Sequence, residues 1–165
     1  MKRLRIYLDT SVISHLDAPD APREQADTHK LWKDIQAGRY IIFISPVVMV
    51  ELMNCAEPKR SILLESLAAI DYTELGETSE VQELAAQYLK AGILPKKSAR
   101  DRQHIAYACV YNCDMIVSWN FEHMVNYKTI SGVKGANALA GYKEMPIYSP
   151  LMLISGGANN DTRNS

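Results

Sequence analysis

The chain has 165 residues, of which 47% are hydrophobic and 22% are charged, and its formal net charge is −1. This length suits one domain with a substantial core and is too short for two well-packed domains. No apolar run approaches the roughly 20 residues that span a bilayer, and the near-zero net charge gives no general sign of nucleic-acid binding. We therefore expect one globular domain over residues 1–154, no membrane segment, and a disordered polar tail over residues 155–165.

The N-terminus and the cysteines both bear on the location of the protein. The chain begins with basic residues, but Arg5 and Asp9 interrupt the apolar stretch that follows and no small-residue cleavage site is present, so we predict a strand rather than a signal peptide. Cys55, Cys109 and Cys113 are an odd number of cysteines in apolar, helical patterns. Such cysteines are typical of reduced core thiols, which predicts a cytoplasmic protein.

Short apolar strands alternate with helical patterns along the chain. The expected strands cover residues 4–8, 40–45, 71–75, 114–119 and 146–149. The expected helices cover residues 24–37, 46–54, 59–70, 79–90 and 98–112, with a short helix after Asn120 and a glycine-containing helical segment beyond it. Residues 17–23 are rich in proline and polar side chains and predict a loop. This alternation predicts an α/β domain with a mostly parallel sheet.

Four polar residues fall where predicted strands end or neighbouring helices begin. Asp9 ends the first strand, Glu51 lies in the helix after the second, Asp101 opens the helix before a late strand, and Asn120 ends that strand. In a parallel sheet such positions collect at one edge. Hard divalent cations such as Mg²⁺ prefer carboxylate oxygens, and a metal held there can activate water against a phosphate ester.

Ordinary structural explanations stay open for each residue alone. Asp9 could cap the helix from Thr10, Asp101 could complete a capping box with Ser98, and Asn120 could cap a helix that begins at the next residue. Glu51 interrupts an apolar run, so its charge needs a partner if the helix is buried, unless it lies on a narrow exposed stripe.

Three segments carry a resemblance to a known family. They are LRIYLDTSVIS, ISPVVMVELMN and DRQHIAYACVYNCDMIVSWNFEHMVN. In order and spacing these segments resemble the three signature regions of PIN domains, in particular those similar to VapC toxins, and the resemblance covers nearly the whole chain apart from the tail. It implies a three-layer α/β/α fold and an Mg²⁺- or Mn²⁺-dependent ribonuclease that leaves a 3′-hydroxyl and a 5′-phosphate. It further implies an RNA substrate, a cognate antitoxin protein and a homodimer.

Carried over by position, the family pattern makes Asp9, Glu51 and Asp101 the metal-site acids. The fourth position, usually Asp, falls on Asn120, which removes one negative charge. This departure motivates an alternative, a PIN fold that has lost catalysis and serves as an RNA-binding or protein-interaction module. A small phosphatase of the aspartyl-phosphate type is disfavoured, because Ser11 stands where such a site needs a second Asp.

Several neighbours of these positions are further candidates. Thr10 and Ser118 could offer hydroxyl groups to a phosphate or to a metal-bound water. Glu122 and Asp114 are disfavoured as substitutes for the missing acid, because Glu122 is expected inside the next helix and Asp114 at the opposite end of the strand.

Basic and aromatic side chains near Asp101 also have two readings. Four of them form a cluster that could steer an RNA backbone or simply be solvated: Lys96, Lys97, Arg100 and Arg102. His104 could be a ligand or a general base, but we expect it to pack within a buried helix, because oxygen-ligand metal chemistry does not need it. Trp119 is expected in the core rather than stacked on a base.

Overall fold

The computed structural model describes residues 2–154. The expected polar tail, residues 155–165, lies outside the described residues, and the domain boundary at residue 154 stays a prediction. One five-stranded sheet has the order β3-β2-β1-β4-β5, and every neighbouring pair of strands is parallel. The strands are β1 (Leu4–Leu8), β2 (Tyr40–Ile44), β3 (Thr73–Glu74), β4 (Met115–Val117) and β5 (Ile147–Tyr148). The expected mostly parallel sheet is confirmed.

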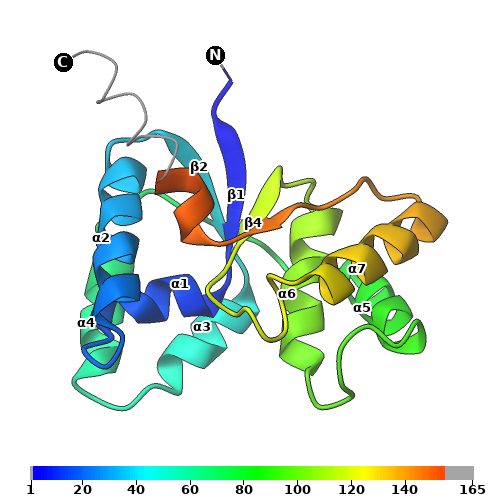
Figure 1. The fold of residues 1–165 in the computed structure, drawn as a ribbon, viewed down its shortest axis with the longest axis horizontal. Helices are drawn as coiled ribbons and strands as arrows, with labels where there is room; N and C mark the ends of the chain where they lie inside the picture. Colours follow the sequence, from blue (N-terminus) through cyan, green and yellow to red (C-terminus); the bar gives the residue numbers. More distant parts are fainter. Residues whose placement is uncertain (1, 155–165) are drawn as a thin grey trace.

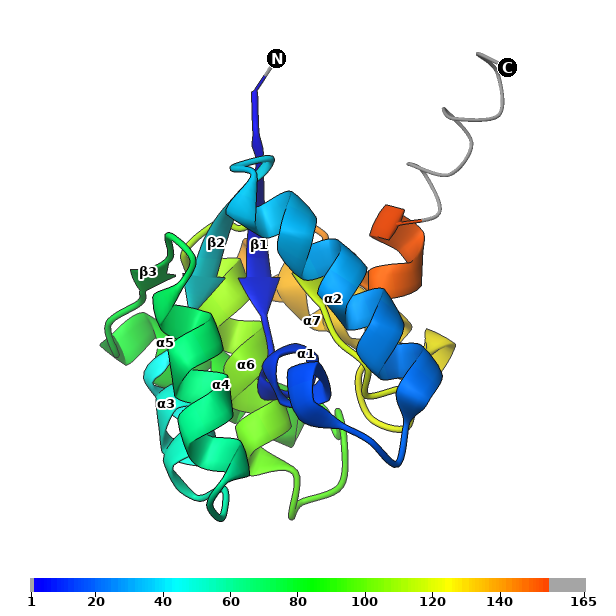
Figure 2. The same cartoon turned by 90° about the vertical axis from the view of Figure 1, so that its left-hand side faces the viewer.

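Helices cover both faces of the sheet. They are α1 (Thr10–Ser14), α2 (Pro22–Gln36), α3 (Pro46–Met53), α4 (Lys59–Ala68), α5 (Ser79–Lys90), α6 (Ala99–Val110) and α7 (Tyr127–Ala140), with a 3₁₀ turn at His15–Asp17. Figure 1 shows α2 and α4 on one side of the strands and α5, α6 and α7 on the other, and the turned view of Figure 2 brings α1 and α2 in front of the sheet. The expected three-layer α/β/α arrangement is therefore confirmed.

The core lies around the carboxyl halves of the two central strands. In β1 and β2 the last three residues are all buried. A parallel sheet covered on both faces requires such continuous apolar runs, and the burial of this surface is the main favourable term in folding. Polar residues that directly follow β1 and β2 therefore lie at the boundary of the core. No helix of residues 2–154 has the length and apolar character needed to cross a membrane.

Helix ends differ from the expectation by one or two residues at several places, and one expected helix is missing from residues 2–154. α2 begins at Pro22 rather than residue 24, because proline suits the first helical position. The short helix predicted after Asn120 is not formed, and residues 121–124 make turns. The reason lies in Asn126, whose amide donates to the carbonyls of Phe121 and Glu122 and whose side-chain oxygen caps α7. Glu122 is therefore in a turn and not inside a helix as expected.

Candidate active site

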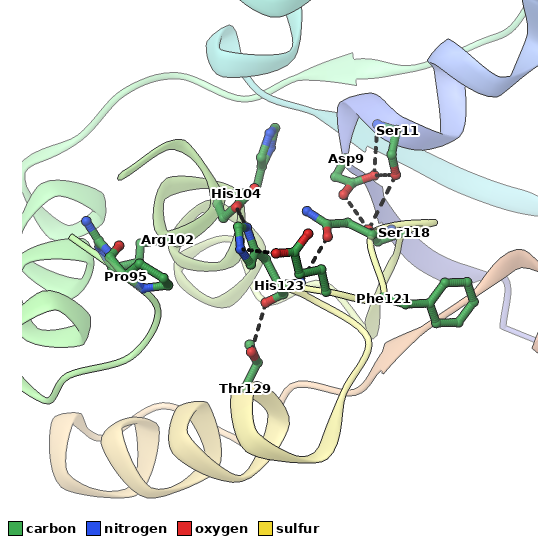
Figure 3. Close-up of polar contacts among 12 residues, drawn as sticks. Asp9, Ser11, Pro95, Arg102, His104, Ser118, Phe121, His123 and Thr129 are labelled. Atoms are coloured by element: carbon green, nitrogen blue, oxygen red, sulfur yellow. Dashed lines mark hydrogen bonds and ion pairs between the residues drawn. The ribbon is translucent and has the colours of Figure 1, made fainter. Parts of the chain in front are cut away.

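Asp9 lies directly after β1 and is 3% exposed. Its Oδ1 accepts hydrogen bonds from the Ser11 main-chain N–H (3.1 Å) and from the Ser11 hydroxyl (2.5 Å), and its Oδ2 accepts one from the Ser118 hydroxyl. Figure 3 shows these three side chains grouped at the end of the strands. The cap predicted for Asp9 is confirmed, since this bond to Ser11 closes the start of α1. Capping, however, occupies only one of its two oxygens.

Burial dominates the electrostatics of this carboxyl. It raises the pKa of Asp9, and the nearby His104 together with the hydroxyls of Ser11 and Ser118 opposes the rise only in part. The groups within hydrogen-bonding distance of Asp9 are neutral donors, so a buried negative charge lacks a cation in contact. Such a carboxylate gains from a bound cation, which makes Asp9 a suitable metal ligand.

Glu51 lies on α3 and its carboxylate is held from two sides. Its Oε1 accepts a hydrogen bond from the Thr10 hydroxyl (2.9 Å) and one from Nε2 of His104 (2.7 Å). Behind it, Nδ1 of His104 is 2.6 Å from the hydroxyl of Tyr7, which is 2.7 Å from the Ser45 hydroxyl. These contacts join Ser45, Tyr7, His104 and Glu51 in one chain of hydrogen bonds that ends on the carboxylate.

This arrangement sets the charge on Glu51. Its side chain is 26% exposed, and burial alone would raise its pKa. The hydrogen bond and charge of His104 outweigh burial, with smaller help from Thr10 and Arg100, and lower the pKa of Glu51 below its ordinary value. Burial meanwhile raises the pKa of Tyr7, which keeps that hydroxyl a neutral donor. Glu51 is therefore an ionised, oriented carboxylate.

Asp101 and Asn120 meet through one residue, His123. Nδ1 of His123 is 3.0 Å from Asp101 Oδ2, and the main-chain N–H of His123 donates to Asn120 Oδ1 (2.9 Å). The capping box predicted for Asp101 is wrong, because the Ser98 side chain makes no capping bond. The helix-cap reading of Asn120 also fails, since its side chain closes a turn instead. Both side chains are thus held by the turn that carries His123.

Other sequence predictions have mixed outcomes. Arg102 is 3% exposed and its guanidinium donates to main-chain carbonyls, so its predicted part in an RNA-steering cluster is wrong. Asp114 lies at the opposite end of β4, where it accepts from the Arg5 N–H, as expected. Trp119 is buried and donates from Nε1 to Thr28, which confirms core packing. His104 is buried as expected, but it also bonds Glu51.

Thr10 donates to Glu51, and Ser118 donates to Asp9. Their suggested service to a phosphate or a metal-bound water stays a prediction. The sequence reasoning missed Ser11, Tyr7 and His123. Ser11 and His123 could have been found from their spacing, two residues after an Asp and three after an Asn, which is typical of local side-chain to main-chain bonds.

The donor chemistry around these acids fits a hard divalent cation. The side chains at this edge offer carboxylate, amide and hydroxyl oxygens, the ligands that Mg²⁺ and Mn²⁺ prefer. Within residues 2–154, no three His, Cys, Asp or Glu side chains already converge as a metal-holding group. Two of the acids bond a histidine instead: Asp101 contacts His123, and Glu51 contacts His104. The residues therefore fit the ion by the chemistry of their ligand atoms.

Comparison with known proteins agrees with this geometry. The PIN domain family profile matches residues 6–121. Among solved structures, the fold is similar to VapBC2 from Rickettsia felis bound to a promoter DNA fragment, with a TM-score of 0.54, 15% identity and coverage of 87% of this chain and 97% of that chain. It is also similar to Mycobacterium tuberculosis VapC20, a sarcin-ricin loop cleaving toxin, with a TM-score of 0.56, 17% identity and coverage of 86% and 98%. No curated protein sequence matches significantly.

The parallel sheet covered by helices on both faces defines the class of protein, an α/β/α domain. More particularly, this chain belongs to the PIN-domain family, because the family profile covers more than half of it. Its structural neighbours include VapC toxins. Because their sequence identity to this chain is only 15% and 17%, the similarity shows a shared fold and nothing further.

Proposed function

We propose that this protein is a metal-dependent ribonuclease that hydrolyses phosphodiester bonds of RNA. The observation that carries the proposal is the buried Asp9 carboxylate, which has only neutral hydrogen-bond donors and directly precedes Thr10, whose hydroxyl binds Glu51. Proteins keep an uncompensated buried charge at functional sites, because it costs stability everywhere else.

The residues that would hold Mg²⁺ or Mn²⁺ are Asp9, Asp101 and Glu51, with the amide oxygen of Asn120 beside them. When bound, such an ion supplies charge neutralisation at the phosphate and lowers the pKa of water. Glu51 is suited to accept a proton or orient a water molecule, because His104 and Thr10 fix its carboxylate and leave it ionised. Asp9 contributes negative charge in a position that cannot drift, since Ser11 and Ser118 hold both oxygens.

Asn120 replaces the acid expected at the fourth position and supplies no charge. Its Oδ1 is already engaged by the His123 N–H, so its contribution is to fix the turn that carries His123. With three acids instead of four, one firmly held metal is favoured over two.

The decisive test is cleavage of a mixed pool of structured and unstructured RNAs with Mg²⁺, Mn²⁺ or EDTA. The Asp9→Asn variant serves as the catalytic control and Asp114→Asn, at the far end of β4, as the matched control. Metal-dependent cleavage that survives Asp114→Asn and disappears in Asp9→Asn supports the proposal. Full cleavage by the Asp9→Asn variant refutes it.

A second candidate function is favoured by Asn120 and by the absence, within residues 2–154, of a preformed cluster of three metal-binding side chains. In that case the fold has lost catalysis and acts as an RNA-binding or protein-interaction module. Titration with Mn²⁺ separates the two, because only a functioning site raises the melting temperature as the ion binds.

The toxin role extends the proposal to a partner. The similar VapBC2 structure contains a toxin with its antitoxin, and by analogy a small antitoxin would block this site. Co-expression with the product of the adjacent gene, followed by co-purification and loss of cleavage, tests this role. A homodimer in the cytoplasm is part of the same proposal, and the mass of the purified protein by light scattering tests the oligomeric state.

A further inference from the structure

A cavity of about 640 Å³ lies beside the candidate active site. One wall is the loop after α5, and the other is the start of α7 with the turn before it. Residues that line it include Ile93, Leu94, Pro95, His123, Lys128 and Thr129. The volume is within the roughly 300–1,000 Å³ of pockets that bind small molecules. The cavity is therefore large enough for one nucleotide.

His123 connects this cavity to the candidate site. Its ring lines the cavity, and its Nδ1 is 3.0 Å from Asp101 Oδ2. Figure 3 shows His123 between Pro95 on one side and Thr129 on the other, with the dashed bond leading back toward the acids. A group bound in the cavity is thus separated from Asp101 by a single imidazole ring.

The loop wall is held in a conformation that costs stability. Arg102 is buried, and its guanidinium donates to the carbonyls of Pro95 (2.7 Å) and Lys96 (2.9 Å) and, more weakly, of Ile93 (3.4 Å). Leu94 has a φ of 69°, in the left-handed region that a leucine rarely adopts. A buried cation with only neutral partners and a strained residue persist together where the surrounding structure fixes them, and such features gather at functional sites.

The lining indicates what the cavity accepts. Ile93, Leu94 and Pro95 offer apolar surface for the flat face of a base, whereas Lys128 and the N-terminal end of α7 offer positive charge for a phosphate. Glu122 also lines the cavity, and its negative charge would weaken the binding of a simple anion that makes no apolar contacts. A nucleotide joins both parts in one ligand.

We propose that this cavity is a subsite for one nucleotide of single-stranded RNA, next to the phosphate that the acids would attack. The proposal rests on the proposed ribonuclease function, because that function supplies the RNA strand. The base would pack on the loop after α5, and a phosphate would contact Lys128. The subsite would thereby fix which nucleotide precedes or follows the cut.

The test uses two variants of exposed lining residues. Ala91→Trp fills the cavity, and Lys128→Glu reverses its charge. The matched controls are Ala86→Trp on α5 and Lys134→Glu on α7, which are exposed and do not line the cavity. Fluorescence anisotropy measures the Kd of a short labelled single-stranded RNA in EDTA, where no metal-dependent cleavage occurs, and thermal melting confirms that each variant folds.

Both cavity variants are expected to weaken RNA binding by about tenfold, because Ala91→Trp blocks the place of the base and Lys128→Glu removes the phosphate contact. Both controls are expected to bind as the wild type does. Equal binding by all five proteins overturns the subsite, as does a wild type that binds no RNA. Failure of the proposed function gives a different result, because the wild type then cleaves no RNA with Mn²⁺. The binding measurements in EDTA test the subsite independently of cleavage.

Discussion

Replacement of Asp9 by Asn removes a buried negative charge, and we expect it to stabilise the metal-free protein while it abolishes cleavage. The carboxylate is 3% exposed, and its hydrogen-bond donors, Ser11 and Ser118, are neutral. Asparagine has almost the same shape. Its amide oxygen can keep the bonds from Ser11, and its NH₂ group can donate to the Ser118 oxygen, which already accepts from the Asn120 N–H.

The expected gain is about 0.5–2 kcal/mol, the range typical of single stabilising substitutions. For a chain of this size 1 kcal/mol corresponds to a melting shift of about 2–4 °C. The gain depends on pH in a defined direction. Because burial raises the pKa of Asp9 in the folded state, its ionised form destabilises the fold above that pKa. The destabilisation shrinks as the pH falls below the folded pKa and is gone below the pKa of the unfolded chain, so the advantage of Asp9→Asn should shrink in acid.

The assay is urea unfolding of both proteins in EDTA at neutral and at acidic pH, followed by thermal melting with added Mn²⁺. Mn²⁺ should raise the melting temperature of the wild type and leave that of Asp9→Asn unchanged. Asp114→Asn is the control for removal of a charge elsewhere, and it should lower stability because the Arg5 N–H and the Lys143 ammonium then lose a charged partner.

One result would refute the reasoning. If Asp9→Asn is less stable than the wild type in EDTA at neutral pH, the carboxylate is a net stabilising cap and not a group kept for metal binding. Retained Mn²⁺ stabilisation in the variant would lead to the same conclusion by a separate route.

Three further substitutions test individual contacts. His104→Phe removes the bond to Glu51 and should raise the Mn²⁺ concentration at half-maximal thermal stabilisation about tenfold; an unchanged midpoint contradicts a positioning role. Arg102→Met leaves loop carbonyls without their donor and should cost about 2–3 kcal/mol in urea unfolding, unless the loop rearranges at no cost. Trp119→Phe loses the bond to Thr28 and should cost about 1 kcal/mol with cleavage intact, and loss of cleavage would place Trp119 in the site instead.

The fold was predictable because its signals are local. Continuous apolar strands such as residues 40–44, each followed by a helical pattern, require a covered parallel sheet. The errors arose where a side chain at some distance decided the structure. Asn126 caps α7 and bonds the preceding turn, which prevents a helix after Asn120. Arg102 reads as a surface cation in sequence, and only the loop carbonyls that fold over it bury it.

The candidate site was predictable in part for the same reason. Asp9 follows a strand and Glu51 interrupts an apolar helix, so both stand out in the sequence. The roles of Tyr7 and Ser45 could not be read there, since the chain that joins them to His104 links residues 38 and 97 positions apart. The contact between Tyr7 and His104 depends on how α6 is placed relative to β1, and a local sequence pattern does not predict that placement.

Helix α6 has the larger part in arranging the acids. Asp101 and His104 are three residues apart and so lie on one face of α6. Asp101 reaches His123, and His104 holds Glu51 of a different helix, so two of the three acids depend on the position of α6. Asp9 depends instead on Ser118 at the end of β4. A ligand that shifts α6 would therefore move Glu51 and Asp101 together relative to Asp9, and a bound cation that all three share would hold the two halves of the site in place.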